Sequence, residues 1–409
     1  MGTTLKKGAG KYIVFALLYL GWCVSYIDRA AISFAMAAIA KDFSLDPKAM
    51  GVVLSTFFIG YSLMQIPGGW LADRFGSKKV IIIAIFFWSV FTMITGLAWS
   101  LASLIVIRFV FGLGEGIFPP ASLKGVAENF SKIERPKMTS ALLSSNYIGS
   151  AIAPMIVAPL ILYAGWRHMF FAIGIAGIVF VAIYWFMVRS NKQEHSIEGQ
   201  EKAAKEKVDT KTLLKMPLMW QLVITWFGLS LVNKGLDSWM PTYLLTVRHM
   251  NLKAVGMALP FPFIAAGIAT AIGGWVMVRF FDGKEKYLLV ISATMTAVFL
   301  YLMAHAATIT SVIAFQCLVY FFKSFVLATT MALPMKMFPG RVVGSAAGMI
   351  NFGGQSAGFV SPLIIGLLIS AFGGSYDAAF WFLIGAACLS VVTSLTIRRT
   401  NKITTMVED

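Results

Sequence analysis

Four charged side chains lie deep within apolar stretches of this chain, where a lipid bilayer would make them costly. Asp28 and Arg29 belong to the first stretch, and Arg108 and Glu115 belong to the fourth. Each charge at the centre of a membrane-spanning helix costs roughly 2.5–3.5 kcal/mol on insertion scales. Such groups therefore pair with one another or face a wet interior, and by default they mark a path for ions, protons or a charged solute.

The spacing of these residues predicts which of them share a helix face. Tyr26 and Arg29 are three residues apart, so a phenol and a guanidinium face one side of the helix, while Asp28 points about 100° away from Arg29. Arg108 and Glu115 lie on one stripe of their helix, about 10 Å apart along its axis. Counted from the outer surface, Arg108 comes first, Asp28 is deeper and Glu115 is deepest.

Two interpretations of the buried acids are open. In the first, Asp28 and Arg108 form a fixed ion pair that sets helix packing. In the second, Asp28 and Glu115 change protonation during a transport cycle, because burial and a neighbouring cation act in opposite directions on a carboxylic acid. Movement of Arg108 between the acids, or arrival of a substrate at Arg29, would then release or take up a proton.

The composition predicts the elements that hold these groups. The chain has 409 residues, of which 58% are hydrophobic and 13% are charged, whereas soluble domains are about 25% charged. Long apolar runs recur along it, each able to cross a hydrocarbon core of about 30 Å. We therefore expect an all-α membrane protein with twelve transmembrane helices. The predicted spans are 12–39, 49–72, 79–98, 101–127, 138–163, 168–189, 218–246, 253–280, 287–306, 309–336, 342–371 and 376–397.

The basic residues predict the orientation of the chain. With twelve spans both termini are on one side, and 24 of the 34 Lys and Arg residues fall on that side. The positive-inside rule makes that side cytoplasmic. The net charge of +16 therefore reflects topology, and we expect no nucleic-acid partner. The cysteines and histidines do not cluster, so we predict no metal, disulfide or cofactor, and we interpret the N-terminal apolar run as a retained first helix.

A polar stretch divides the spans six and six. We predict a first six-helix bundle over 1–189, a cytoplasmic linker over 190–216 and a second six-helix bundle over 217–409. Gly68-Gly69-Trp70 recurs as Gly273-Gly274-Trp275, and Asn146-x-x-Gly149 recurs as Asn351-x-x-Gly354, both at an offset of 205. Two pseudo-symmetric bundles with a binding site between them, near the bilayer midplane, are a common transporter plan.

Small residues and prolines mark the fourth span. Gly112, Gly114 and Gly116 favour close helix packing, and no strand surrounds them, as a dinucleotide fingerprint would require. Pro119 and Pro120 predict a kink just past Glu115.

The second span ends in a hydrogen-bonding face followed by a charged turn. Tyr61 and Gln65 are one turn apart, and they either pack with a satisfied amide or form a wall for a hydroxylated solute. The turn that follows reads Gly69-x-Leu-Ala-Asp73-Arg74-x-Gly76, and there Asp73 can cap a helix and accept from an arginine.

This turn resembles the signature loop of the major facilitator superfamily. The patterns Tyr26-x-Asp28-Arg29, Tyr61-x-x-x-Gln65-Ile-Pro-Gly-Gly-Trp, Arg108-Phe-x-x-Gly-x-x-Glu115-Gly and Ala-Ser-Leu-Lys124-Gly-Val-Ala-Glu128 resemble its anion:cation symporter branch, which includes bacterial hexuronate, galactonate and glucarate transporters.

The resemblance implies proton-driven uptake of an organic anion across a bacterial inner membrane by a protein that we expect to be monomeric. It implies that Arg29 holds the substrate carboxylate, that Asp28 and Glu115 carry protons, and that Arg108 is their partner. It places Tyr26, Tyr61 and Gln65 on the polyol and Asn351 at a polar site position, with Gln355 one turn further on. It makes the turn residues Gly69, Asp73, Arg74 and Gly76 gating or structural.

Three lysines fit this pattern less well. Lys124 either reaches the inner cavity or extends to the cytoplasm, and Lys323 either contacts a second anionic group or is structural. Lys234 and Asp237 are three residues apart near the outer end of their span, so they read either as a snorkelling pair or as functional groups of unknown role. Another departure is Val278, which stands where the acidic turn residue would repeat in the second half.

The sequence therefore predicts a proton-coupled symporter for a sugar acid such as a hexuronate or aldonate, working by alternating access. An exchanger of organic phosphate or another carboxylate is the main alternative, and Lys124 and Lys323 would suit phosphate. Efflux of cationic drugs conflicts with Arg29 at the cavity face. No set of nucleophile and base, metal cluster or phosphate loop is visible, so we do not expect an enzyme.

Overall fold

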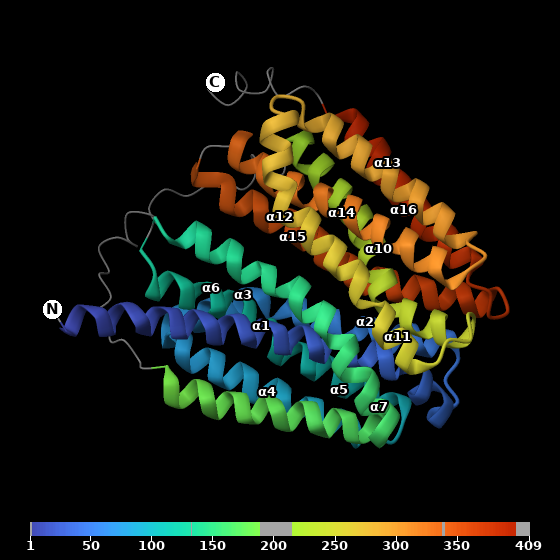
Figure 1. The fold of residues 1–409 in the computed structure, drawn as a ribbon, viewed down its shortest axis with the longest axis horizontal. Helices are drawn as coiled ribbons and strands as arrows, with labels where there is room; N and C mark the ends of the chain where they lie inside the picture. Colours follow the sequence, from blue (N-terminus) through green and yellow to red (C-terminus); the bar gives the residue numbers. More distant parts are fainter. Residues whose placement is uncertain (1, 132, 189–214, 338–339, 398–409) are drawn as a thin grey trace.

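The protein forms two bundles of helices, seen in a computed structural model that describes residues 2–131, 133–188, 215–337 and 340–397 (Figure 1). The first bundle comprises α1 (Gly2–Phe43), α2 (Pro47–Leu63), α3 (Gln65–Phe75), α4 (Ser77–Gly96), α5 (Leu101–Gly116), α6 (Phe118–Asn129) and α7 (Arg135–Met187). The second comprises α10 (Pro217–Thr246), α11 (Leu252–Ala258), α12 (Pro260–Phe280), α13 (Glu285–Ala304), α14 (Ile309–Met337), α15 (Gly340–Ala371) and α16 (Asp377–Thr396). Most of the predicted linker, from 190 to 214, lies outside the described residues.

These helices account for twelve spans. Within the described residues, nine helical stretches are long and apolar enough to cross a membrane, and the bent pair α2–α3 makes a tenth. α7 is counted once but contains two spans, which meet at Gly165 with a φ of 77°. α10 is 30 residues long and interrupts its apolar residues with Asn233, Lys234 and Asp237. The predicted all-α fold of twelve transmembrane helices is confirmed.

Prolines explain where the spans break. α2 and α3 meet at Met64 with a bend of 42°, just before Pro67. α5 and α6 meet at Ile117, just before Pro119 and Pro120. A proline donates no backbone hydrogen bond, and its ring clashes with the carbonyl four residues earlier, so it favours a bend or break in the helix. The predicted kink past Glu115 is confirmed.

Glycines bring α5 against α2. A Cβ atom on Gly112 would lie 2.3 Å from the carbonyl oxygen of Phe57, and one on Gly116 would lie 2.4 Å from that of Tyr61. Neither distance leaves room for a side chain, which supports the interpretation of these glycines as packing residues. The close approach fixes the heights of Arg108 and Glu115 relative to α2.

The two bundles repeat one packing arrangement. Gly149, in the first span of α7, lies against Cys23 and Tyr26 of α1. Its counterpart Gly354, in α15, lies against Trp226 of α10. In each bundle the fifth span therefore packs on the first through the repeated glycine, so the repeat in the sequence is also a repeat in packing.

The bundles share a core at one end only. One large buried cluster joins the C-terminal part of α1 (Ile39) and the start of α2 (Met50) to α10 (Leu244) and α15 (Ile369). The buried residues of the next two clusters belong to one bundle each. Figure 1 shows the bundles diverging toward the N-terminal end of α1. The structure is thus closed at one end and splayed at the other.

Candidate functional site

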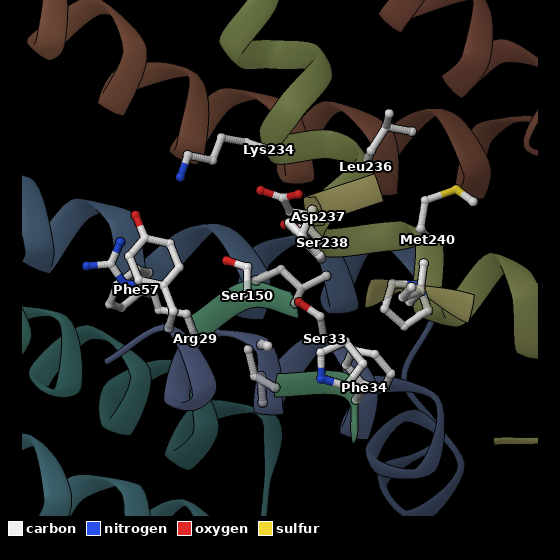
Figure 2. Close-up of a pocket in the computed structure, with 18 of the residues that line it drawn as sticks. Arg29, Ser33, Phe34, Phe57, Ser150, Lys234, Leu236, Asp237, Ser238 and Met240 are labelled. Atoms are coloured by element: carbon white, nitrogen blue, oxygen red, sulfur yellow. The ribbon is translucent and has the colours of Figure 1, made fainter. Parts of the chain in front are cut away.

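A cavity of about 90 Å³ lies between the two bundles, lined by residues of both (Figure 2). That volume holds several water molecules or a small solute, since one water needs roughly 10–15 Å³ on this measure. Most of the wall is apolar. The titratable side chains that line it are Tyr26, Arg29, Arg108, Lys234, Asp237 and Tyr320. Cations therefore outnumber acids at the surface of the cavity.

Arg29 forms a buried ion pair with Glu115. Its Nε lies 2.6 Å from Glu115 Oε1, and the side chains are 11% and 0% exposed. The hydroxyl of Ser25 donates to the same carboxylate oxygen. Arg29 Nη2 and Glu115 Oε2 have no hydrogen-bond partner among the described residues. The pair therefore keeps one free donor and one free acceptor.

Aromatic rings of α1 and α2 hold the Arg29 guanidinium in place. Its central carbon lies 4.5 Å from the ring centre of Tyr61, 4.9 Å from that of Tyr26 and 5.5 Å from that of Phe57. Cations are attracted to aromatic faces at such distances, most strongly where water is excluded. Tyr26 and Tyr61 thus support Arg29, and only Tyr26 also lines the cavity.

Asp28 and Arg108 are buried close to this pair without forming an ion pair with each other. Asp28 is 2% exposed and accepts a hydrogen bond from Thr92 at 3.2 Å. Arg108 is 2% exposed, lies 4.4 Å from the ring centre of Phe111, and its Nε has no partner in the described part of the chain. We expected Arg108 to be the partner of the acids, but Arg29 is the arginine that reaches Glu115.

Gln65 compensates for the broken backbone of the fourth span. Its Nε2 donates to the carbonyl of Gly116 at 3.3 Å. In an unbroken helix that carbonyl would accept from residue 120, which is a proline and has no N–H to donate. Gln65 does not line the cavity, and this contact matches the structural interpretation of its amide.

The second bundle contributes a hydrogen-bonded group that the sequence reasoning left without a role. Asn233 donates to Asp237 at 3.0 Å, Tyr320 donates to the other oxygen of Asp237, and Lys323 donates to Asn233. Lys323 thus stands behind the lining residues. Gln316, Tyr320 and Lys323 follow the spacing i, i+4, i+7, which places them on one face of α14. That spacing was the signal that could have found the group.

Lys234 projects into the cavity. Its Nζ lies 5.1 Å from the ring centre of Phe58, and no ion pair joins it to Asp237 among the described residues. Figure 2 shows the side chain directed away from Asp237 and toward the region of Arg29. The snorkelling pair that we considered is therefore not what the structure shows.

Like Tyr61, Gln65 and Lys323, three further predicted substrate contacts lie away from the cavity lining. Lys124 forms an ion pair with Asp73 at 2.9 Å, on the turn-proximal side of the α5–α6 break. Asn351 is exposed, and Gln355 is partly buried with an unpartnered amide oxygen. Whether α15 brings these two amides to a substrate in another conformation stays a prediction.

The turn between α3 and α4 carries charged side chains and is closed by a glycine. Gly76 has a φ of 82°, which favours glycine, and its N–H closes α3 by bonding to Ala72. Arg74 lies over the ring of Trp70 at 5.3 Å. A Cβ on Gly69 would make only ordinary contact with Pro120, at 3.7 Å. The ion pair of Asp73 with Lys124 then ties the end of α3 to α6.

Comparisons with known proteins agree with this geometry. A family model described as the Major Facilitator Superfamily matches residues 18–362 and 254–405. A protein of Cupriavidus necator described as a probable sulfoacetate transporter is 30% identical over 93% of this chain and 92% of its own. A protein of Escherichia coli described as a probable galactarate/D-glucarate transporter is 29% identical over 95% of both chains.

A solved structure shares the fold. The inward-facing, unoccupied crystal structure of a bacterial homologue of the human lysosomal transporter Spinster superposes with a TM-score of 0.83. It is 18% identical and covers 95% of this chain and 97% of its own. At that identity the likeness establishes the architecture and nothing about the substrate.

Proposed function

Because the chain belongs to the Major Facilitator Superfamily and is a multi-pass membrane transporter of organic anions rather than an enzyme, we propose that it is a proton-coupled symporter. Its substrate class is the sugar acids and related small organic acids that the similar proteins are described as carrying. The cavity lies between the two bundles of this chain, and we propose that the protein works as a monomer.

The ion pair between Arg29 and Glu115 carries the proposal. A substrate carboxylate needs the guanidinium of Arg29, and Glu115 occupies it at 2.6 Å. A proton on Glu115 removes the competing charge and frees Arg29 for the anion. Proton and anion therefore favour each other's binding, and this reciprocal linkage is what couples two ligands in a symporter.

Asp28 is the second proposed proton carrier. It is buried and accepts a hydrogen bond from the hydroxyl of Thr92, and no arginine forms an ion pair with it among the described residues. A carboxylate left in that state inside a membrane is costly, so gain of a proton stabilises the site. Arg108 is also buried and forms no ion pair among the described residues, and we assign it the role of acting on the charges of both acids.

The shape of the molecule fits alternating access. The shared core closes the end where α1 finishes and α2 begins, and the basic surface segments predict that the opposite, splayed end is cytoplasmic. In this assignment both termini face the cytoplasm of a bacterium, and the structure is the inward-facing state in the inner membrane. The two bundles would move as units about the cavity.

Transport into sealed vesicles tests the proposal. Vesicles that contain the purified protein should accumulate a sugar acid such as glucarate or galactonate when the only gradient imposed is one that drives protons inward. Arg29→Ala should abolish both accumulation and binding. Uptake that ignores the pH gradient and requires an internal anion would instead identify an exchanger and refute proton symport.

A further inference from the structure

Lys234 is a cation of the second bundle that faces the cavity and forms no ion pair among the described residues. Among the described residues it is the one lysine that lines the cavity, and its ammonium lies over the ring of Phe58. The obvious partner on its own helix is engaged elsewhere, because Asp237 accepts from Asn233 and from Tyr320. Lys323, which donates to Asn233, completes that group without using Lys234.

Two neighbouring rings bring Lys234 close to Arg29. The rings of Phe57 and Phe58 have centres 4.9 Å apart on α2. The guanidinium of Arg29 lies 5.5 Å from the first, and the ammonium of Lys234 lies 5.1 Å from the second. The two cations therefore face one small cavity from opposite bundles.

This arrangement is poorly matched to a substrate with one negative charge. A monoanion on Arg29 leaves Lys234 charged and unpaired when the cavity closes, and an unpaired buried charge is costly. A second acidic group on the same molecule removes that cost. It also links the bundles through the substrate, so that binding favours closure.

We propose that the preferred substrate is a small organic dianion, with one acidic group on Arg29 and the other on Lys234. The inference rests on the proposed function, since it assigns the second contact of the same site. A carboxylate or a sulfonate could serve at either end, because both offer the charged oxygen acceptors that an ammonium or guanidinium binds.

Two ligands with the same number of carbon atoms separate the effect of the second charge from the effect of the hydroxyl groups. Glucarate carries a carboxylate at both ends of six carbons, and gluconate carries one. If the second carboxylate forms one charge-assisted contact, the wild-type protein should bind glucarate about 10- to 100-fold more tightly than gluconate. Lys234→Gln should abolish the preference, because glucarate loses its second contact and gluconate no longer leaves a buried ammonium unpaired. Lys234→Arg should keep the preference, which separates loss of charge from misfolding.

The measurement is the ligand concentration that gives half the thermal stabilisation of each purified protein. Lys48→Gln, an exposed lysine on α2, is the matched control and should behave as wild type. Equal binding of both acids by wild type, or a glucarate preference that survives Lys234→Gln, would overturn the dianion inference and leave the proposed function standing. Failure of both acids to bind the wild-type protein would instead count against the proposed function itself.

Discussion

Replacing Glu115 by glutamine is the sharpest test of competition for Arg29. The amide keeps an acceptor for Arg29 and for Ser25 but removes the negative charge. The variant therefore imitates a permanently protonated Glu115. We expect it to bind the anion at any pH between 5 and 8, whereas the wild-type protein binds more tightly as pH falls.

The contacts at Glu115 set the size of the effect. A hydrogen bond to a charged group contributes about 1.5–3 kcal/mol, so removal of the competing charge should tighten anion binding about 10- to 100-fold at pH 8. Without ligand the variant should be less stable. The loss is bounded by the roughly 3–5 kcal/mol that follows removal of one partner from a buried pair, since Arg29 keeps a neutral acceptor. Saturating anion should recover about 2.7 kcal/mol at 100 times Kd.

Two measurements check this prediction. Thermal unfolding with graded anion gives Kd at each pH, and vesicle uptake shows that the variant exchanges anion but no longer accumulates it under a pH gradient. Glu134→Gln, at the exposed start of α7, is the control and should retain the wild-type pH dependence. If Glu115→Gln keeps that dependence, or binds more weakly at every pH, competition for Arg29 is not the coupling step.

Three further expectations follow from single contacts. Asp28→Asn should bind anion but fail to concentrate it in vesicles; full gradient-driven accumulation would remove Asp28 from the proton path. Gly116→Ala should lose about 1–3 kcal/mol of stability, because its Cβ would meet an α2 carbonyl oxygen at 2.4 Å. The control Gly274→Ala, whose Cβ would have nothing within 4 Å, should melt at the same temperature as the wild-type protein. Asp73→Asn should cost at most about 1 kcal/mol, since its pair with Lys124 is 65% exposed on the Asp73 side; a larger shift in melting temperature would contradict solvent screening.

Local patterns were enough to predict the spans and their breaks. The seventh predicted span, 218–246, coincides with α10 at Pro217–Thr246, because apolar length and flanking polar residues decide where a helix enters and leaves a membrane. The break past Glu115 followed from two prolines, whose effect on a helix depends only on their immediate neighbours. Both inferences rest on interactions within a few residues.

The pairing of the charges was beyond such patterns. Helical phase places Arg108 and Glu115 on one stripe, but it does not give the offset between α1 and α5 along their axes. That offset decides which arginine reaches Glu115, and it depends on contacts between helices, such as the glycine contacts that seat α5 on α2. Gln65 is a similar case, because its partner is a carbonyl left free by a proline on another helix.

The unsatisfied polar atoms of this fold connect the two bundles into one site. Arg29 Nη2, Glu115 Oε2, Arg108 Nε and Gln316 Oε1 are all buried without partners among the described residues, and three of these four residues line the cavity. Native proteins seldom leave such groups unsatisfied, because each costs free energy that apolar packing would not. The two donors, on Arg29 and Arg108, belong to the first bundle, and the acceptor Gln316 Oε1 belongs to the second. A ligand that satisfies the lining atoms must therefore offer acceptors to the first bundle and a donor to the second, as a hydroxylated acid does. A ligand of that kind stabilises the state in which the bundles meet around it, which is the step that alternating access requires.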